Sequence, residues 1–147
     1  MTGILGAERI TTIFGYWPSF HDAEVLRIVL DRESDSGGGP LLTAELATWE
    51  ITNEVGGDGF LVLRHRTHVV LAFRGVVELE LSEFNQQNVL HRLEIEDVAA
   101  RQLELVKFRV QFASSFGVGA AFGCREVEVM SAVPLEGERA GAAPDDR

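Results

Sequence analysis

The residues best suited to chemistry are a histidine and an aspartate that adjoin in the segment Tyr16-Trp17-Pro18-Ser19-Phe20-His21-Asp22. A histidine beside a carboxylate can act as a general base or bind a metal. Catalysis also needs a nucleophile or a third oriented group, and a metal site needs three or four ligands. We therefore expect the aromatic residues to close one end of a sheet while His21 and Asp22 bond loop backbone groups. The alternative is a ligand-binding or enzymatic pocket built from His21, Asp22 and His91.

The remaining reactive side chains form no recognisable constellation. His65 and His68 lie three positions apart, so on a strand they face opposite ways and cannot chelate together. Cys124 is the only cysteine, and a single thiol on a strand is usually inert core. The glycine runs are not followed by the Gly-Lys-Ser/Thr of a phosphate-binding loop. We predict no catalytic residue, no metal and no cofactor, and hence a protein that is not an enzyme.

Four consecutive side-chain amides follow Phe84: Asn85, Gln86, Gln87 and Asn88. Amides both donate and accept hydrogen bonds. They can bond the backbone of a turn between two strands, which is the commoner use. They can instead form a polar contact patch for a partner.

Length and composition indicate one ordinary globular domain. The chain has 147 residues, a 46% apolar fraction and a net charge of −10. We expect a β-rich domain over residues 1–135 and a flexible tail over 136–147, which is rich in Gly, Ala and charge. A lone cysteine, no secretion signal and no bilayer-length apolar run favour a cytoplasmic protein that does not enter membranes.

The charge is unevenly spread along the chain. Residues 76–104 carry seven acids against two arginines, a net charge of −5. Such an acidic body repels phosphate backbones, so direct nucleic-acid binding is disfavoured. The same field can attract a basic protein partner, although acidic residues also serve solubility alone.

The dominant pattern is alternation of apolar and polar residues with a period of two, which is typical of half-buried strands. Glycine-rich breaks at 37–40 and 56–59, together with Gly75, Gly117 and Gly119, separate the strands, and Gly75 predicts a kink. Short helical turns are expected at Ser19–Ala23 and Val98–Gln102. The predicted strands are Glu24–Asp31, Leu42–Ile51 with a bulge, Phe60–Leu63 and His68–Phe73 covered on both faces, Val77–Ser82, His91–Glu96, Val106–Phe112 and Cys124–Ser131.

Seven or eight short strands at this spacing predict a mainly β fold. We expect an antiparallel, meander-like sheet folded as a sandwich or partly open barrel. The alternation does not give the order of the strands. Exposed edge strands would also allow a homodimer.

Three segments together resemble the bacterial immunity protein 50 family. They are Phe14–Val25 with its Trp-Pro-Ser-Phe-His-Asp core, the stretch from Val70 through Phe84-Asn85-Gln86-Gln87-Asn88 to Leu90, and the closing Gly119–Cys124 with Val127, Val129 and Pro134. The resemblance covers roughly Ile13 to Pro134. It implies a small cytosolic protein, encoded beside a polymorphic toxin, that binds the toxin domain and blocks it. It supplies no catalytic residues.

An acidic β domain without a catalytic site suits inhibition by surface complementarity. If the toxin is a nuclease with a basic cleft, the acidic strands could lie across that cleft as a charge mimic. The candidate partner-binding residues are Trp17, His21, Asp22, Glu78, Glu80, Asn85, Gln86, Gln87, Asn88, Glu94 and Glu96.

Overall fold

The computed structural model describes residues 3–34 and 37–135, and the tail predicted to be flexible, 136–147, lies outside them. The elements in chain order are α1 (Glu8–Phe14), β1 (Glu24–Asp31), β2 (Leu41–Val55), β3 (Leu61–Arg74), β4 (Val77–Ser82), β5 (Val89–Asp97), a 3-10 turn η1 (Ala99–Arg101), β6 (Phe108–Phe116), β7 (Gly119–Cys124) and β8 (Glu126–Pro134).

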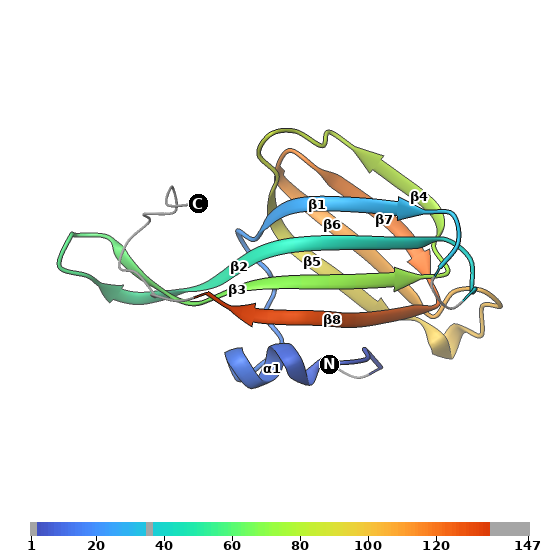
Figure 1. Cartoon of the computed structure of the whole chain (residues 1–147), viewed down its shortest axis with the longest axis horizontal. Helices are drawn as coiled ribbons and strands as arrows, with labels where there is room; N and C mark the ends of the chain where they lie inside the picture. Colours follow the sequence, from blue (N-terminus) through green and yellow to red (C-terminus); the bar gives the residue numbers. More distant parts are fainter. Residues whose placement is uncertain (1–2, 35–36, 136–147) are drawn as a thin grey trace.

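The eight strands form one antiparallel sheet in the order β4-β7-β6-β5-β1-β2-β3-β8, and this sheet is not closed. The predicted fold class, mainly β with a partly open sheet, is therefore confirmed. The sheet folds into two halves whose strands cross: β1, β2, β3 and β8 lie over the diagonal strands β4 to β7 (Figure 1). Pairing between the halves at β1 and β5 is confined to Glu24 and Val89.

The core lies between the two halves. Phe73 of β3 packs against Phe112 of β6 and Phe122 of β7, with ring centroids 6.1 and 5.2 Å away. All three rings are at most 3% exposed. Burial of large aromatic side chains from both halves holds the folded sheet together.

The halves are also joined at Gly75, where the sequence predicted a kink. The β3–β8 ladder ends at the Arg74–Glu126 pair, and the β4–β7 ladder resumes at Val77–Gly123. The β3–β4 and β7–β8 connections both bend between these pairs. Gly75 has φ +73°, and a Cβ there would lie 3.1 Å from the Arg125 side chain. Glycine is needed because the two bends touch.

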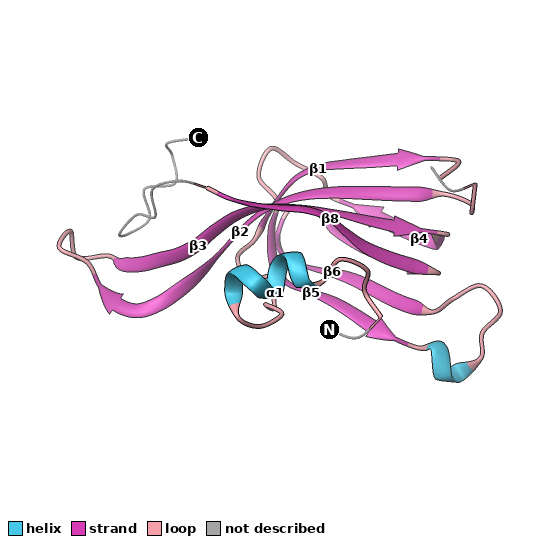
Figure 2. Cartoon of the chain, turned by 60° about the horizontal axis from the view of Figure 1, so that its bottom comes forward, coloured by secondary structure: helices cyan, strands magenta, loops and turns pink. Residues whose placement is uncertain are grey.

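Helix α1 covers one side of the folded sheet (Figure 2) and was not predicted. Ile10 and Phe14, four residues apart, are both buried in the core, and Gly15 ends the helix in the left-handed conformation. An i, i+4 apolar pair followed by glycine is a helix signal. The helix has seven residues and no side-chain N-cap, so that signal is weak.

Several local predictions were wrong. Ser19–Ala23 is not helical: Phe20 and Asp22 have φ of +63° and +67°, and the Ser19 hydroxyl accepts a hydrogen bond from the backbone N–H of His21. Leu61–Leu63 and His68–Phe73 belong to one strand, β3, and Phe60 lies in the turn before it. Strand β7 occupies Gly119–Cys124, where only a break had been expected. The short helical turn predicted at Val98–Gln102, in contrast, is confirmed as η1.

The β2–β3 hairpin extends beyond the rest of the sheet as a projecting arm (Figures 1 and 2). We call residues 49–66 the hairpin arm. It begins past the Thr48–Thr67 pair and ends in a turn closed by the bond from Gly56 N–H to the Phe60 carbonyl. Phe60 and Leu61 are 59% and 46% exposed, so the expectation that Phe60–Leu63 is covered on both faces was wrong.

Candidate partner-binding surfaces

The segment Tyr16–Asp22 forms the corner between the two halves. Backbone bonds run from Leu93 N–H to the Ser19 carbonyl and from Asp22 N–H to the Leu90 carbonyl, so the segment follows the edge of β5 before β1 leaves it. Phe20 is 1% exposed and Trp17 packs edge-on against it at 5.7 Å. Phe20 and Trp17 therefore pack in or against the core, in line with the expectation for the aromatic residues, whereas Tyr16 is 47% exposed and does not. Trp17, a candidate contact, is half-buried.

His21, Asp22 and His91 do come together at the surface. The His21 Nδ1 lies 2.9 Å from the His91 carbonyl, which can only accept, so this nitrogen donates. The His21 and His91 rings lie 5.5 Å apart, and His21 Nε2 lies 3.6 Å from Asp22 Oδ1. The His21 side chain is 55% exposed. The cluster has no nucleophile, and its geometry explains how one histidine is held to the backbone of β5.

The acidic residues of β4 and β5 share one hollow on the outer face of the sheet. In the strand order β4-β7-β6-β5, two strands separate β4 from β5. The register of these strands aligns Glu80, Ala121, Gln111 and Glu94 in a row across the sheet. The hollow has a volume of about 700 Å³. We call it the outer groove. Its polar lining residues are Glu78, Glu80, Glu94, Glu96, Arg109 and Gln111.

Small residues at the centre of the sheet make the outer groove hollow. Ala121 lies in its floor, and a Cβ at the neighbouring Gly123 would lie 3.1 Å from the Arg109 guanidinium. Arg109 therefore lies across β7 and reaches Glu78 at 3.5 Å. Glu78 itself has φ +55° at a bulge of β4, which re-aims its side chain.

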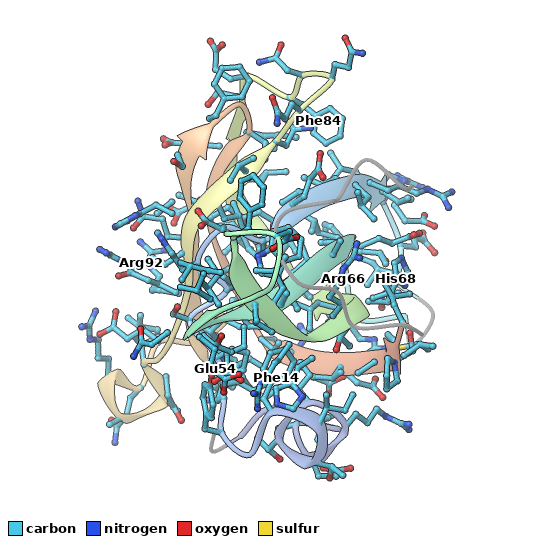
Figure 3. All side chains as sticks on the ribbon, turned by 90° about the vertical axis from the view of Figure 1, so that its left-hand side faces the viewer. Phe14, Glu54, Arg66, His68, Phe84 and Arg92 are labelled. Carbon is cyan, nitrogen blue, oxygen red and sulfur yellow. The ribbon has the colours of Figure 1, made fainter. Side chains whose placement is uncertain are left out.

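Arginines accompany three of the four glutamates, which the charge pattern along the chain did not reveal. Arg92 pairs with Glu94 at 2.5 Å, and Arg101 pairs with Glu96 at 3.3 Å. Figure 3 shows Arg92 pointing outward from β5, on the side away from His68. These pairs are solvent-exposed and so contribute little stability. The groove therefore carries glutamates in exposed pairs with arginines, and it is not a purely acidic face.

The amide segment divides into one structural residue and three exposed ones. Asn88 is 3% exposed; its Oδ1 accepts from the N–H groups of Asn85 and Val118, and its Nδ2 donates to the Asn85 carbonyl. The turn interpretation therefore holds for Asn88, whose amide is not offered to a partner. Asn85, Gln86 and Gln87 are exposed beside Phe116.

Cys124 is buried, and desolvation raises the pKa of its thiol to about 12. It faces the core, in keeping with an inert role. Within residues 3–34 and 37–135, no group of three or more His, Cys, Asp or Glu side chains is placed to hold a metal ion.

Sequence reasoning missed a cluster at the base of the hairpin arm. The Tyr16 hydroxyl donates to Glu50 Oε2 at 2.7 Å, and His65 Nε2 lies 3.4 Å from Glu50 Oε1. The His65 ring also packs on Phe14 of α1 at 5.4 Å. These contacts tie the arm to α1 and the corner segment. Beside them is a hollow of about 250 Å³ lined by Tyr16, Pro18, Ser19, Phe20, His21, Trp49, Glu50 and Ile51.

Comparison with known proteins gives one match. The sequence matches the family model described as immunity protein 50 over residues 6–135. No curated protein and no solved structure matches the chain. Of the helices in the described part of the chain, none combines the length and apolarity required to cross a membrane.

Proposed function

The chain belongs to the immunity protein 50 family, and on that premise we propose that it is a non-enzymatic cytoplasmic protein that neutralises a cognate polymorphic toxin by binding its toxin domain. The family match over residues 6–135 carries this proposal. An inhibitor that binds its toxin one to one needs a contact surface and no catalytic site. The exposed ion pairs of the outer groove can supply such a surface, and no catalytic site is assembled among the described residues.

The outer groove is the first contact surface that we propose. Glu80 has no ion-pair partner among the described residues, so its carboxylate is available to a cation. The pairs made by Glu78, Glu94 and Glu96 are exposed and can be exchanged for lysines or arginines of a toxin. With a net charge of −10 on the chain, association with a basic toxin domain is accelerated. A nuclease toxin with a basic cleft would be one such domain.

A second candidate function uses the cluster of His21, Asp22 and His91 as a small-molecule or catalytic pocket. The approach of the two rings to 5.5 Å favours it. The open surface position and the bond of His21 to the His91 carbonyl favour a structural role instead. Retention by His21→Ala of whatever ligand binding or catalytic activity the chain shows would remove this candidate.

Co-expression tests the proposal. Cells that express the toxin domain encoded by the adjacent gene should survive when they also produce this chain, and purified toxin domain and chain should co-elute. The control is a toxin domain from an unrelated polymorphic system, which the chain should neither bind nor block. If the cognate domain is neither bound nor blocked, the proposal is wrong.

A further inference from the structure

The hairpin arm carries an apolar face that the fold leaves exposed. In the β2–β3 register, Ile51 lies opposite Leu63 and Val55 opposite Leu61. Ile51, Val55 and Leu61 are 43%, 66% and 46% exposed. We call Ile51, Val55, Leu61 and Leu63 the apolar face of the arm. An isolated two-stranded hairpin is only marginally stable, so an exposed apolar face on one indicates a surface that a partner covers.

The other face of the arm carries charged side chains. Glu50 lies opposite Arg64, and Arg64 Nη2 donates to Glu54 Oε2 at 2.6 Å. The two faces are therefore distinct. The arm presents the apolar face on one side and the ion pair of Arg64 with Glu54 on the other.

The apolar face continues into the hollow at the base of the arm. Ile51 belongs to both, and Trp49, Tyr16 and Pro18 line the hollow beside it. Aromatic residues grouped around a cavity are typical of the residues that dominate binding energy at protein interfaces. The hydrogen bond from Tyr16 to Glu50 and the contact of Phe14 with His65 hold the base of the arm in place, so the hollow and the face are already positioned relative to each other.

Charge decides which occupant fits this surface. A second copy of the chain would bring a net charge of −10 against another −10. A partner with an apolar projection flanked by lysine or arginine suits both the apolar face and this negative net charge.

We propose that the apolar face of the arm and the hollow at its base dock the toxin domain, receiving an aliphatic or aromatic projection of that domain whose rim is basic. This inference rests on the proposed function. It adds a second contact surface with a different task. The outer groove governs how fast the partners associate, whereas the arm governs how long they stay together, because desolvated apolar contacts act mainly on the dissociation rate.

The test compares lysine substitutions at exposed apolar residues inside and outside this surface. Ile51→Lys lies at the junction of face and hollow, and Val55→Lys lies near the end of the arm, where a 66% exposed side chain contributes nothing to the core. Leu30→Lys is the matched control, since Leu30 is 54% exposed on β1 at the opposite end of the sheet. Circular dichroism and thermal unfolding establish that each variant is folded.

Surface plasmon resonance with the cognate toxin domain then measures dissociation. We expect Ile51→Lys and Val55→Lys each to raise the dissociation rate roughly tenfold or more, with little change in association rate. Leu30→Lys should match the wild type. Backbone amides of residues 49–63 should become protected from hydrogen exchange in the complex.

The outcomes separate the two proposals. If the wild type binds the toxin domain and both arm variants bind equally well, the docking inference is wrong while the proposed function stands. If the wild type does not bind at all, both are wrong. If sedimentation shows a wild-type dimer that Val55→Lys dissociates, the occupant is a second copy, which overturns the inference.

Discussion

Tyr16 donates its phenolic proton to Oε2 of Glu50 over 2.7 Å, which joins the loop after α1 to the base of the hairpin arm. The two residues lie 34 positions apart in the sequence. The contact links the aromatic corner segment, which the sequence marks as unusual, to an arm that no sequence pattern identified. The orientation of the arm therefore depends on a neutral hydroxyl beside a carboxylate.

This contact predicts an unusual tyrosine titration. The hydrogen bond to Glu50, followed by burial and by the charge of Glu50, raises the pKa of Tyr16 above its ordinary value. Since Tyr16 is the only tyrosine, the ultraviolet absorbance of tyrosinate reports on it alone. The folded chain holds the proton more tightly than the unfolded chain, so the contact stabilises below the ordinary pKa and is lost as pH rises through the folded pKa. Glu50→Ala should lower the pKa, whereas Glu54→Ala should leave it raised.

Asn88 should be a stability residue and its neighbours should not. Asn88→Ala removes three hydrogen bonds from a buried turn and should lower the free energy of unfolding by about 2–3 kcal/mol. Gln86→Ala and Gln87→Ala alter exposed side chains and should change it by less than about 0.5 kcal/mol. Urea unfolding measures all three. Equal effects at the three positions would contradict the assignment of the turn to Asn88.

The thiol of Cys124 should be unreactive in the folded protein. Burial raises its pKa to about 12, and its side chain is inaccessible. An aromatic disulfide reagent at mildly alkaline pH should label no thiol in native protein and one thiol per chain in denaturant. Rapid labelling of the native protein would show that Cys124 is reached by solvent.

Neutralising the outer groove should slow association with the toxin domain. Changing Glu78, Glu80, Glu94 and Glu96 to Gln should reduce the association rate roughly tenfold at low salt and flatten its salt dependence. Glutamine is preferred to lysine here because lysines would repel Arg92, Arg101 and Arg109. Glu8, Glu33, Glu83 and Glu104 changed together to Gln give a control of equal charge. A control that slows association equally would show that net charge, and not the groove, is responsible.

Strands that are half-buried were the predictable part of the fold. Val110 and Phe112 of β6 are buried between exposed Arg109 and Gln111, so alternation identified that strand. Strand β7 escaped because its outward residues Gly119, Ala121 and Gly123 are small rather than polar, so it shows no alternation, and its two glycines suggest a break. Alternation depends on neighbours along the chain, whereas the place of β7 in the sheet depends on pairing with β4 and β6.

The candidate surfaces show the same division between local and non-local information. The acidic residues of β4 and β5 were identified in the sequence, but their union in one groove depends on two strands placed between them. Arg109 entered the groove because Gly123 leaves space for it across β7. The apolar run at Phe60–Leu63 predicted burial, because composition does not distinguish a covered strand from one that projects beyond the sheet.

The measurement that tests the central claim most directly is a titration of toxin activity by the purified chain. A fixed amount of the cognate toxin domain is mixed with increasing amounts of the chain, and residual toxin activity is read after short and long incubation. A binding inhibitor abolishes activity at one equivalent, and the curve does not move with time. Progressive loss of toxin activity at a small fraction of one equivalent would mean catalytic turnover by the chain and would contradict the account.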